Sequence, residues 1–185
     1  MTSGWIQTYS GLQMFPLDAK PEQIDLVDIA HALSQTCRFS GHTRRFYSVA
    51  QHCCHVSDWL LVNRTPGALL ATLGLLHDAT EAYLTDIPRP IKGDIPTYKF
   101  HEAKLEHVIM WRFNLPEPDR DVWGYWRDVK EADTSILFDE RAQLLGPPPA
   151  AWDFEVKPLG IDLPEWGPTE ARGQFLKRAA ALGLT

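Results

Sequence analysis

The sequence is poor in cysteine and has no long hydrophobic run. Its three cysteines, Cys37, Cys53 and Cys54, are an odd number with two adjacent, which fits neither a disulfide framework nor a paired CxxC metal site. No stretch approaches the ~18 unbroken apolar residues of a membrane span. The N-terminus also lacks the basic region and apolar run of a signal peptide. We therefore expect no membrane contact and a cytoplasmic location, in a bacterial cell or in the host cytoplasm if the protein is phage-encoded.

The sequence also lacks a surplus of positive charge. Its 18 lysines and arginines are outnumbered by 24 acidic residues, which gives a formal net charge of −6. A protein that coats nucleic acid needs a dominant basic face, so this balance argues against a nucleic-acid polymer as partner. A few local cations can still serve a small anionic ligand, and the candidates are Arg38, Arg44, Arg45, Arg89 and Lys92.

Helical periodicity dominates the hydrophobic pattern. With 185 residues and 44% hydrophobic content, the chain can fill one core, so we predict a single domain over 1–185. One helical face begins after Ser48 and carries Val49, Cys53, Val56 and Leu60. The next helix is predicted to begin at Thr65-Pro66 and to run to about Leu84, with other helices near 22–35, 105–113 and 169–183. The fold class is therefore all-α.

Two segments do not follow this pattern. Residues 4–15 mix aromatics with a Ser-Gly turn signal and predict a short hairpin or extended arm. Residues 146–168 are too rich in proline for regular structure, and we expect them to wrap the surface with their aromatic side chains held against it.

Four polar side chains fall where the helices should be buried. His52 lies beside the apolar face of its helix, and His77 and Asp78 end the most hydrophobic segment of the chain. Asp133 takes an apolar position on a helical stripe with Val122, Trp126, Val129 and Ile136. A histidine alone would be interpreted as a half-buried core residue, but two buried aspartates need cations or strong donors.

A divalent metal meets that demand. Two imidazoles and two carboxylates suit Mn, Fe, Co, Ni or Zn, and Mg remains open. The sequence therefore predicts a metal site formed by His52, His77, Asp78 and Asp133, with one or two ions.

The ordered pattern H…HD…D resembles the HD-domain metal-dependent phosphohydrolases. The segments CRFSGHTRRFYSVAQHC, LLHDATEAYLTDIPRPIK and EAD are similar to those of bacterial 5'-deoxynucleotidases and phage dATP triphosphohydrolases. The resemblance covers about residues 4–145. It implies an HD-domain helical bundle with a core at about 20–145, a C-terminal extension at 146–185, and self-association into a homo-oligomer.

The resemblance also implies roles for further residues. Glu81 would orient or deprotonate the attacking water, and Asp86 would assist near the leaving oxygen. Arg38 and Lys92 match positions that hold substrate phosphates. Many relatives of the deoxynucleotidase type have tryptophan where Phe39 stands here.

The expected function is hydrolysis of a nucleotide phosphate by attack of a metal-bound water. A 5'-nucleotidase acting on deoxynucleoside monophosphates is favoured, with a dNTP (dATP-like) triphosphohydrolase as the alternative. A non-catalytic nucleotide-binding or regulatory HD module remains open, although such modules usually lose ligands. An iron oxygenase of the same fold would need additional histidine ligands, for which the sequence has no good candidates.

Overall fold

The computed structural model describes residues 4–118, 121 and 123–185. In that part the chain is mostly helical with one small hairpin, as the sequence predicts. The longer helices are α1 (Leu26–Gln35), α2 (Val49–Asn63), α3 (Gly67–Leu76), α6 (Pro96–Arg112), α7 (Tyr125–Leu144) and α8 (Pro168–Ala181). Short helical turns are η1 (Pro21–Gln23), η2 (Arg38–Gly41), α4 (Glu81–Leu84) and α5 (Arg89–Lys92).

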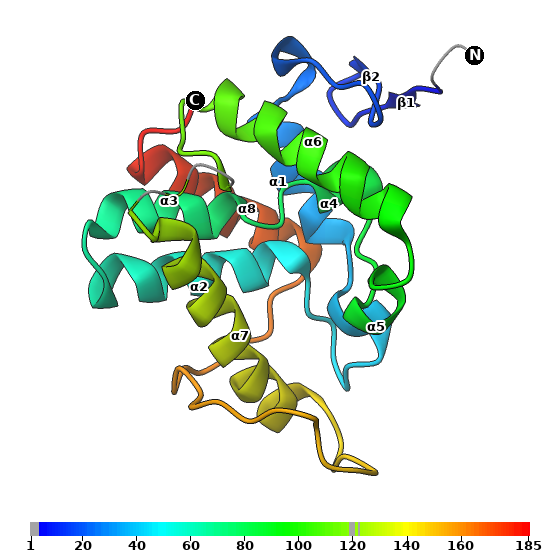
Figure 1. Cartoon of the computed structure of the whole chain (residues 1–185). Coiled ribbons are helices and arrows are strands. Elements are labelled where there is room, and N and C mark those ends of the chain that lie inside the picture. Colours follow the sequence, from blue (N-terminus) through cyan, green and yellow to red (C-terminus); the bar gives the residue numbers. More distant parts are fainter. Residues whose placement is uncertain (1–3, 119–120, 122) are drawn as a thin grey trace.

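The hairpin consists of β1 (Ile6–Gln7) and β2 (Gln13–Met14), paired antiparallel with Ile6 opposite Met14. Met14 is fully buried. Asp28 on α1 accepts hydrogen bonds from the backbone N–H and the hydroxyl of Ser10, at 2.6 and 2.8 Å. The hairpin is therefore fastened to the helical body (Figure 1).

Helices α2 and α3 pack side by side at the centre of the molecule (Figure 1). The Ser48 side chain caps α2 by accepting a hydrogen bond from Gln51 N–H at 3.2 Å. The two helices approach closely at Gly74, where an added Cβ would lie 2.6 Å from Cδ1 of Leu60. This close packing holds the end of α3 against the middle of α2.

The prediction of one helix from Thr65 to Leu84 is wrong. Helix α3 ends at Leu76, a turn spans 77–80, and α4 begins at Glu81. Ala79 N–H and Glu81 N–H bond to carbonyls three residues back, which is the tighter pattern of a 3-10 turn. The break moves the polar residues out of the helix and into a turn beside the core.

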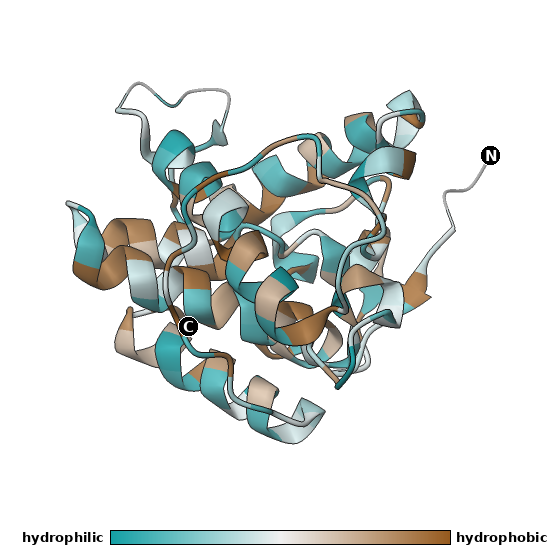
Figure 2. Ribbon diagram, turned by 90° about the horizontal axis from the view of Figure 1, so that it is seen from below, coloured by the Kyte–Doolittle hydropathy of each residue, from teal (hydrophilic) through white to brown (hydrophobic). Residues whose placement is uncertain are grey.

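The predicted inward faces are mostly correct. In the helix predicted near 22–35, Ile29, Ala30 and Leu33 form the buried face of α1, whereas the apolar Val27 is 37% exposed. Brown and teal residues alternate along the ribbons in Figure 2, as amphipathic helices require. Val122 lies outside the described residues. No helix among the described residues is both long and apolar enough to cross a bilayer.

The segment between α7 and α8 has no regular structure and passes around the C-terminal half of α7 (Figure 1). Asp139 on α7 is buried and accepts hydrogen bonds from three consecutive backbone N–H groups, those of Leu159, Gly160 and Ile161, at 2.7, 2.9 and 3.1 Å. Gln51 on α2 donates to the carbonyl of Pro164 at 2.6 Å. The segment is thus anchored at its far end.

Candidate metal centre

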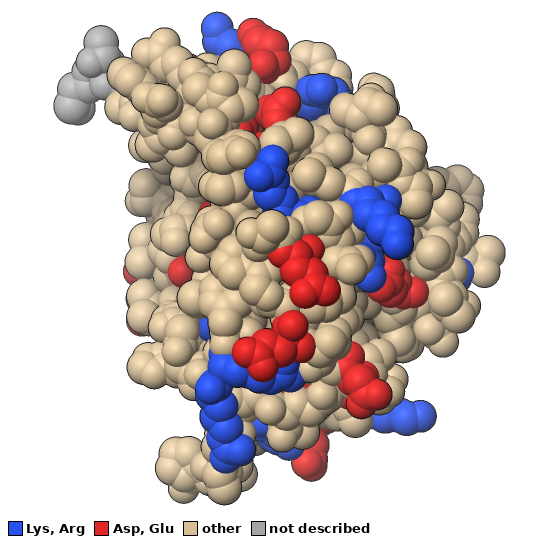
Figure 3. All heavy atoms as spheres, turned by 180° about the vertical axis from the view of Figure 1, so that it is seen from behind, with Lys and Arg blue, Asp and Glu red and all other residues tan. Residues whose placement is uncertain are grey.

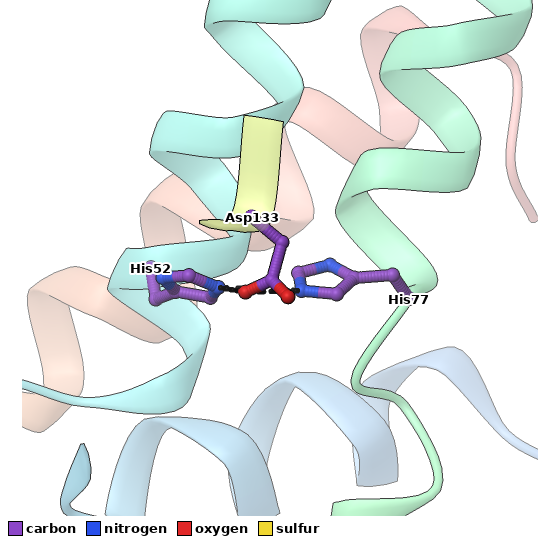
Figure 4. Close-up of side chains that lie close together, drawn as sticks. All are labelled: His52, His77 and Asp133. Carbon is purple, nitrogen blue, oxygen red and sulfur yellow. Dashed lines mark hydrogen bonds and ion pairs between the residues drawn. The ribbon is translucent and has the colours of Figure 1, made fainter. Parts of the chain in front are cut away.

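Side chains from three elements meet beside the break after α3. The rings of His52 on α2 and His77 after α3 point toward the carboxylate of Asp133 on α7 (Figure 4). The Nε2 atoms of the two histidines are 3.2 Å apart, and Asp133 Oδ1 lies 3.3 Å from the first and 3.9 Å from the second. Three ligand atoms within this range could hold a metal ion.

Asp78 lies beside this group and shares His77 with it. Its Oδ2 lies 3.2 Å from Nε2 of His77 and 3.8 Å from Nε2 of His52. All four residues expected to form the metal site therefore bring a nitrogen or oxygen atom to one region. Two imidazoles and two carboxylates are a donor set suited to a divalent metal.

Both histidines turn Nε2 toward this region. His52 Nδ1 is 2.7 Å from Oε1 of Glu140, and His77 Nδ1 is 2.8 Å from the carbonyl of Gly74. Both acceptors require a hydrogen on Nδ1, so the neutral ring carries its lone pair on Nε2. Outer partners of this kind fix the tautomer of metal-binding histidines.

Sequence reasoning missed Glu140. It lies seven residues after Asp133 on α7, two helical turns along the same side, and is fully buried. Burial raises the pKa of this carboxyl, but Arg38 and His52 hold it below its ordinary value. An acid at a core position seven residues from a predicted ligand was the signal that could have found it.

Arg38 lies on the inner side of the centre. Its guanidinium contacts Asp78 Oδ2 at 3.4 Å and Glu140 Oε2 at 3.3 Å, and the residue is 9% exposed. In this position Arg38 compensates one fully buried carboxylate, that of Glu140, and the partly exposed carboxylate of Asp78. It also lines a cavity, so a phosphate-binding role is open to it alongside this one.

The ligand candidates shift one another's pKa values through their charges and hydrogen bonds. Burial alone would lower the pKa of His77, but the Asp78 charge raises it well above the ordinary value. Burial opposes ionisation of Asp133 as well, yet its hydrogen bond to His52 and the charge of His77 lower the pKa of this carboxyl well below its usual range. Without a metal, a protonated imidazole thus takes the place of the cation that the carboxylates require.

The carboxyl of Glu81 differs from that of Asp133, because its pKa is raised and not lowered. Burial, together with the charges of Asp78 and Asp86, raises the pKa of Glu81 to about 9. Its Oε2 is buried and has no hydrogen-bond partner among the described residues. Asp86 is half-buried and lines the same cavity, and burial raises its pKa as well. An orphaned buried oxygen beside four donors fits a site that takes up a metal or a ligand.

Cys53 lies next to the centre. Its sulfur forms a second close group with His77 and Asp78. Burial raises the pKa of the Cys53 thiol, which opposes the thiolate form that binds metals. Cys54 interacts instead with Arg178 on α8, so the two thiols lie on different faces of α2, as helical geometry predicts.

Two cavities open beside the centre and share Asp78, Lys92, Lys130 and Asp133. The first is about 350 Å³, extends toward α6 and includes Lys99, Glu102 and Glu106. The second is about 460 Å³ and includes Arg38, Glu81 and Asp86. Both lie within the roughly 300–1,000 Å³ range of small-molecule sites.

Cations line the rim. Lys92 forms an ion pair with Glu102, which places its charge between the two cavities. Arg89 and Lys130 each lie 2.8 Å from Asp133 Oδ2. Arg89 is among the candidate cations named from the sequence, whereas Lys130 is not, because an exposed cation carries no periodic signal. On the face in Figure 3, basic and acidic side chains are interspersed.

Fold and site together define a helical protein with a buried His/Asp cluster that could hold a divalent metal beside a cation-rimmed cavity. The chain is 36% identical over 184 residues to the uncharacterized protein YfdR of Escherichia coli K12, an alignment that covers 94% of this chain and 93% of YfdR. It is 33% identical over 155 residues to an uncharacterized protein of Rhodobacter capsulatus, covering 79% and 76% of the two chains. No protein-family model matches. The chain belongs to the family of these two bacterial proteins.

Proposed function

We propose that this protein is an HD-domain phosphohydrolase that uses a divalent metal to hydrolyse nucleotide phosphates, with deoxynucleoside 5'-monophosphates as the favoured substrates. One observation carries the proposal. Asp78, Asp133 and Glu81, whose Oε2 is unpaired among the described residues, line one cavity with the cations Arg38 and Lys92. The imidazoles of His52 and His77 lie against Asp133 and Asp78, at 3.3 and 3.2 Å. A non-catalytic binding module has no use for an orphaned buried acid beside the ligands.

His52, His77, Asp78 and Asp133 would hold the metal. The ion supplies Lewis-acid chemistry, lowering the pKa of a water and neutralising charge on a phosphoryl oxygen. With a divalent ion held at these donors, Glu81 would lose its proton more readily, and its carboxylate would accept the proton of the attacking water. Proton transfer by a positioned carboxylate contributes roughly 10²–10⁴-fold to a rate.

The other side chains act on the phosphate. Lys92 and Arg89, at the cavity rim, stabilise the charge that develops on the phosphoryl oxygens. Arg38 reaches the same cavity while it compensates Asp78. Asp86, raised in pKa by burial, can donate a proton to the leaving oxygen.

A dNTP triphosphohydrolase is the second candidate. Three lysines, Lys92, Lys99 and Lys130, line the first cavity, which is next to the metal ligands and could receive a longer phosphate chain. Glu102 and Glu106 line the same cavity and oppose an extended anion, so the monophosphate is preferred.

A panel of deoxy- and ribonucleotides with Mn²⁺, Co²⁺, Mg²⁺ and Zn²⁺ tests the proposal, with both products identified by chromatography. A 5'-nucleotidase releases orthophosphate and nucleoside, whereas a triphosphohydrolase releases triphosphate. Turnover that persists unchanged after metal removal, or no turnover of any nucleotide with any metal, would defeat the proposal.

A further inference from the structure

We propose that the second cavity holds the nucleobase of the substrate and that the C-terminal extension supplies the aromatic wall that recognises it. The inference rests on the proposed function. It assigns substrate recognition to Trp152 and Phe154, which lie in a segment outside the resemblance to known hydrolases.

The lining of the second cavity is of two kinds. Asp78, Asp133 and Glu81 belong to the metal centre, and a phosphate would be held near them. Leu137, Trp152 and Phe154 are apolar or aromatic and have no part in that centre. A ligand with an anionic group and a flat apolar group matches this combination, and a nucleotide is such a ligand.

The aromatic wall is a packed cluster. Phe138 on α7 is 5% exposed, and its ring centroid lies 5.8 Å from that of Trp152 and 5.7 Å from that of Phe154. The guanidinium of Arg141 lies 4.5 Å from the Phe138 ring and 5.0 Å from the Trp152 ring. Edge-to-face aromatic pairs and cation–π contacts of this kind hold the rings in place.

The extension is anchored so that these rings stay at the cavity. It leaves α7 after Leu144 and is held again by Asp139, which binds three backbone N–H groups of residues 159–161. Trp152 and Phe154 lie in the span between these two points. Phe154 remains 43% exposed, so its ring is accessible to a ligand in the cavity that it lines.

Phe39 lines the same cavity in an unusual backbone conformation. Its φ of 54° lies in the left-handed region, which bulky side chains rarely adopt. Strain of this kind persists where the surrounding structure enforces it, and it concentrates at binding sites. Phe39 thus adds a third aromatic ring to the cavity from the opposite end of the sequence.

The experiment compares binding with and without a base. The probes are deoxyadenosine 5'-monophosphate and 2-deoxyribose 5-phosphate, with Kd measured by calorimetry on Mn²⁺-loaded protein in a Glu81→Gln background that suppresses turnover. Trp152→Ala is compared with the conservative Trp152→Phe. The matched control is Trp111→Ala, since Trp111 is 67% exposed on α6 and lines neither cavity of the centre.

We expect the base to tighten binding about tenfold or more in the parent, because a base stacked on an aromatic ring adds favourable contact that the sugar phosphate alone lacks. Trp152→Ala should reduce the ratio of the two Kd values to near one, while Trp152→Phe and Trp111→Ala keep it. The inference would be overturned if Trp152→Ala left the ratio of the two Kd values unchanged, or if the parent bound both probes with the same Kd.

Wild-type turnover of the same two probes separates this inference from the proposed function. If both compounds are hydrolysed but binding does not depend on the base, the proposed hydrolase function is supported and the base pocket is refuted. If binding depends on the base and on Trp152 but neither compound is hydrolysed with any metal, the base pocket is supported and the proposed hydrolase function is refuted.

Discussion

Glu140 Oε1 lies 2.7 Å from Nδ1 of His52, in a position where neither side chain meets solvent. This contact fixes the hydrogen on Nδ1 and leaves Nε2 to face His77, Asp78 and Asp133. Glu140 thereby orients one metal-ligand candidate and, through Arg38, is coupled to another. Glu140 and Arg38 thus form an outer layer around the ligand candidates, and their contacts fix how those candidates are oriented.

The first prediction concerns this outer layer. Glu140→Gln keeps the size of the side chain but removes its charge. The amide oxygen is a weaker acceptor for His52 Nδ1–H, and its NH2 group can turn toward the ring instead, so the tautomer of His52 is held less firmly. We expect Mn²⁺ or Co²⁺ affinity to fall about 10–100-fold, as measured by metal titration. Glu131→Gln, on the same helix but with a side chain 59% exposed, is the control. Equal affinities in the two variants would refute the role of Glu140.

Arg38 provides a second prediction. Arg38→Leu leaves Asp78 and Glu140 without their cation, and we expect the free energy of unfolding to fall by about 3 kcal/mol in the metal-free protein. A divalent metal should restore part of that loss, because it compensates Asp78. Denaturant unfolding with and without Mn²⁺ measures both effects.

Arg89→Leu is the control for Arg38, since Arg89 is half exposed and its partner Asp133 keeps Lys130 and His52 when Arg89 is removed. Its loss should cost at most about 1 kcal/mol. If the two arginine variants lose the same stability, Arg38 does not compensate the buried acids.

The third prediction separates catalysis from metal binding. Glu81→Gln should retain the metal and lose turnover by about 10²–10⁴-fold, because the amide cannot accept the proton of the attacking water. His77→Ala should lose the metal and the activity together. His42→Ala, at an exposed position, should change neither. A Glu81→Gln protein with near-native turnover would remove Glu81 from the mechanism.

The fourth prediction concerns pH. Burial lowers the pKa of His55 to about 4, below its ordinary value of 6.5. The unfolded chain therefore takes up a proton below pH 6.5 that the folded protein takes up only near pH 4, so this contribution to stability is present above pH 6.5 and is lost as the pH falls through that window.

Between pH 7 and pH 5, we expect His55 to account for about 2 kcal/mol of the lost free energy of unfolding. His55→Gln should lose correspondingly less over this interval, as measured by urea unfolding at both pH values. An identical pH dependence in the wild type and the variant would show that His55 is not the responsible group.

Periodicity predicted the helices well and their boundaries less well. The pattern Val49, Cys53, Val56 and Leu60 located α2 and its buried face, because side-chain burial follows the helical repeat directly. The break after Leu76 was missed, since the turn at His77–Thr80 keeps near-helical dihedrals and contains no proline or glycine. Only the tertiary position of His77 and Asp78 distinguishes this turn from a continuous helix.

The metal-ligand candidates were found because polar residues at apolar positions are conspicuous. The burial of Glu140 and the position of the extension beside the cavity were not predicted, for different reasons. Glu140 lies next to Asp139 on a polar stretch of α7, so its burial depends on how α2 and α7 pack. Trp152 and Phe154 lie in an aperiodic segment, and long-range hydrogen bonds to Asp139 determine where it lies.

Anomalous scattering from crystals grown with Mn²⁺ or Co²⁺ tests the central claim most directly. The account predicts a peak within about 2.0–2.2 Å of Nε2 of both His52 and His77, with oxygens of Asp78 and Asp133 also bound. A metal-soaked crystal without such a peak, or with the metal bound elsewhere and these four side chains still paired with one another, would contradict it.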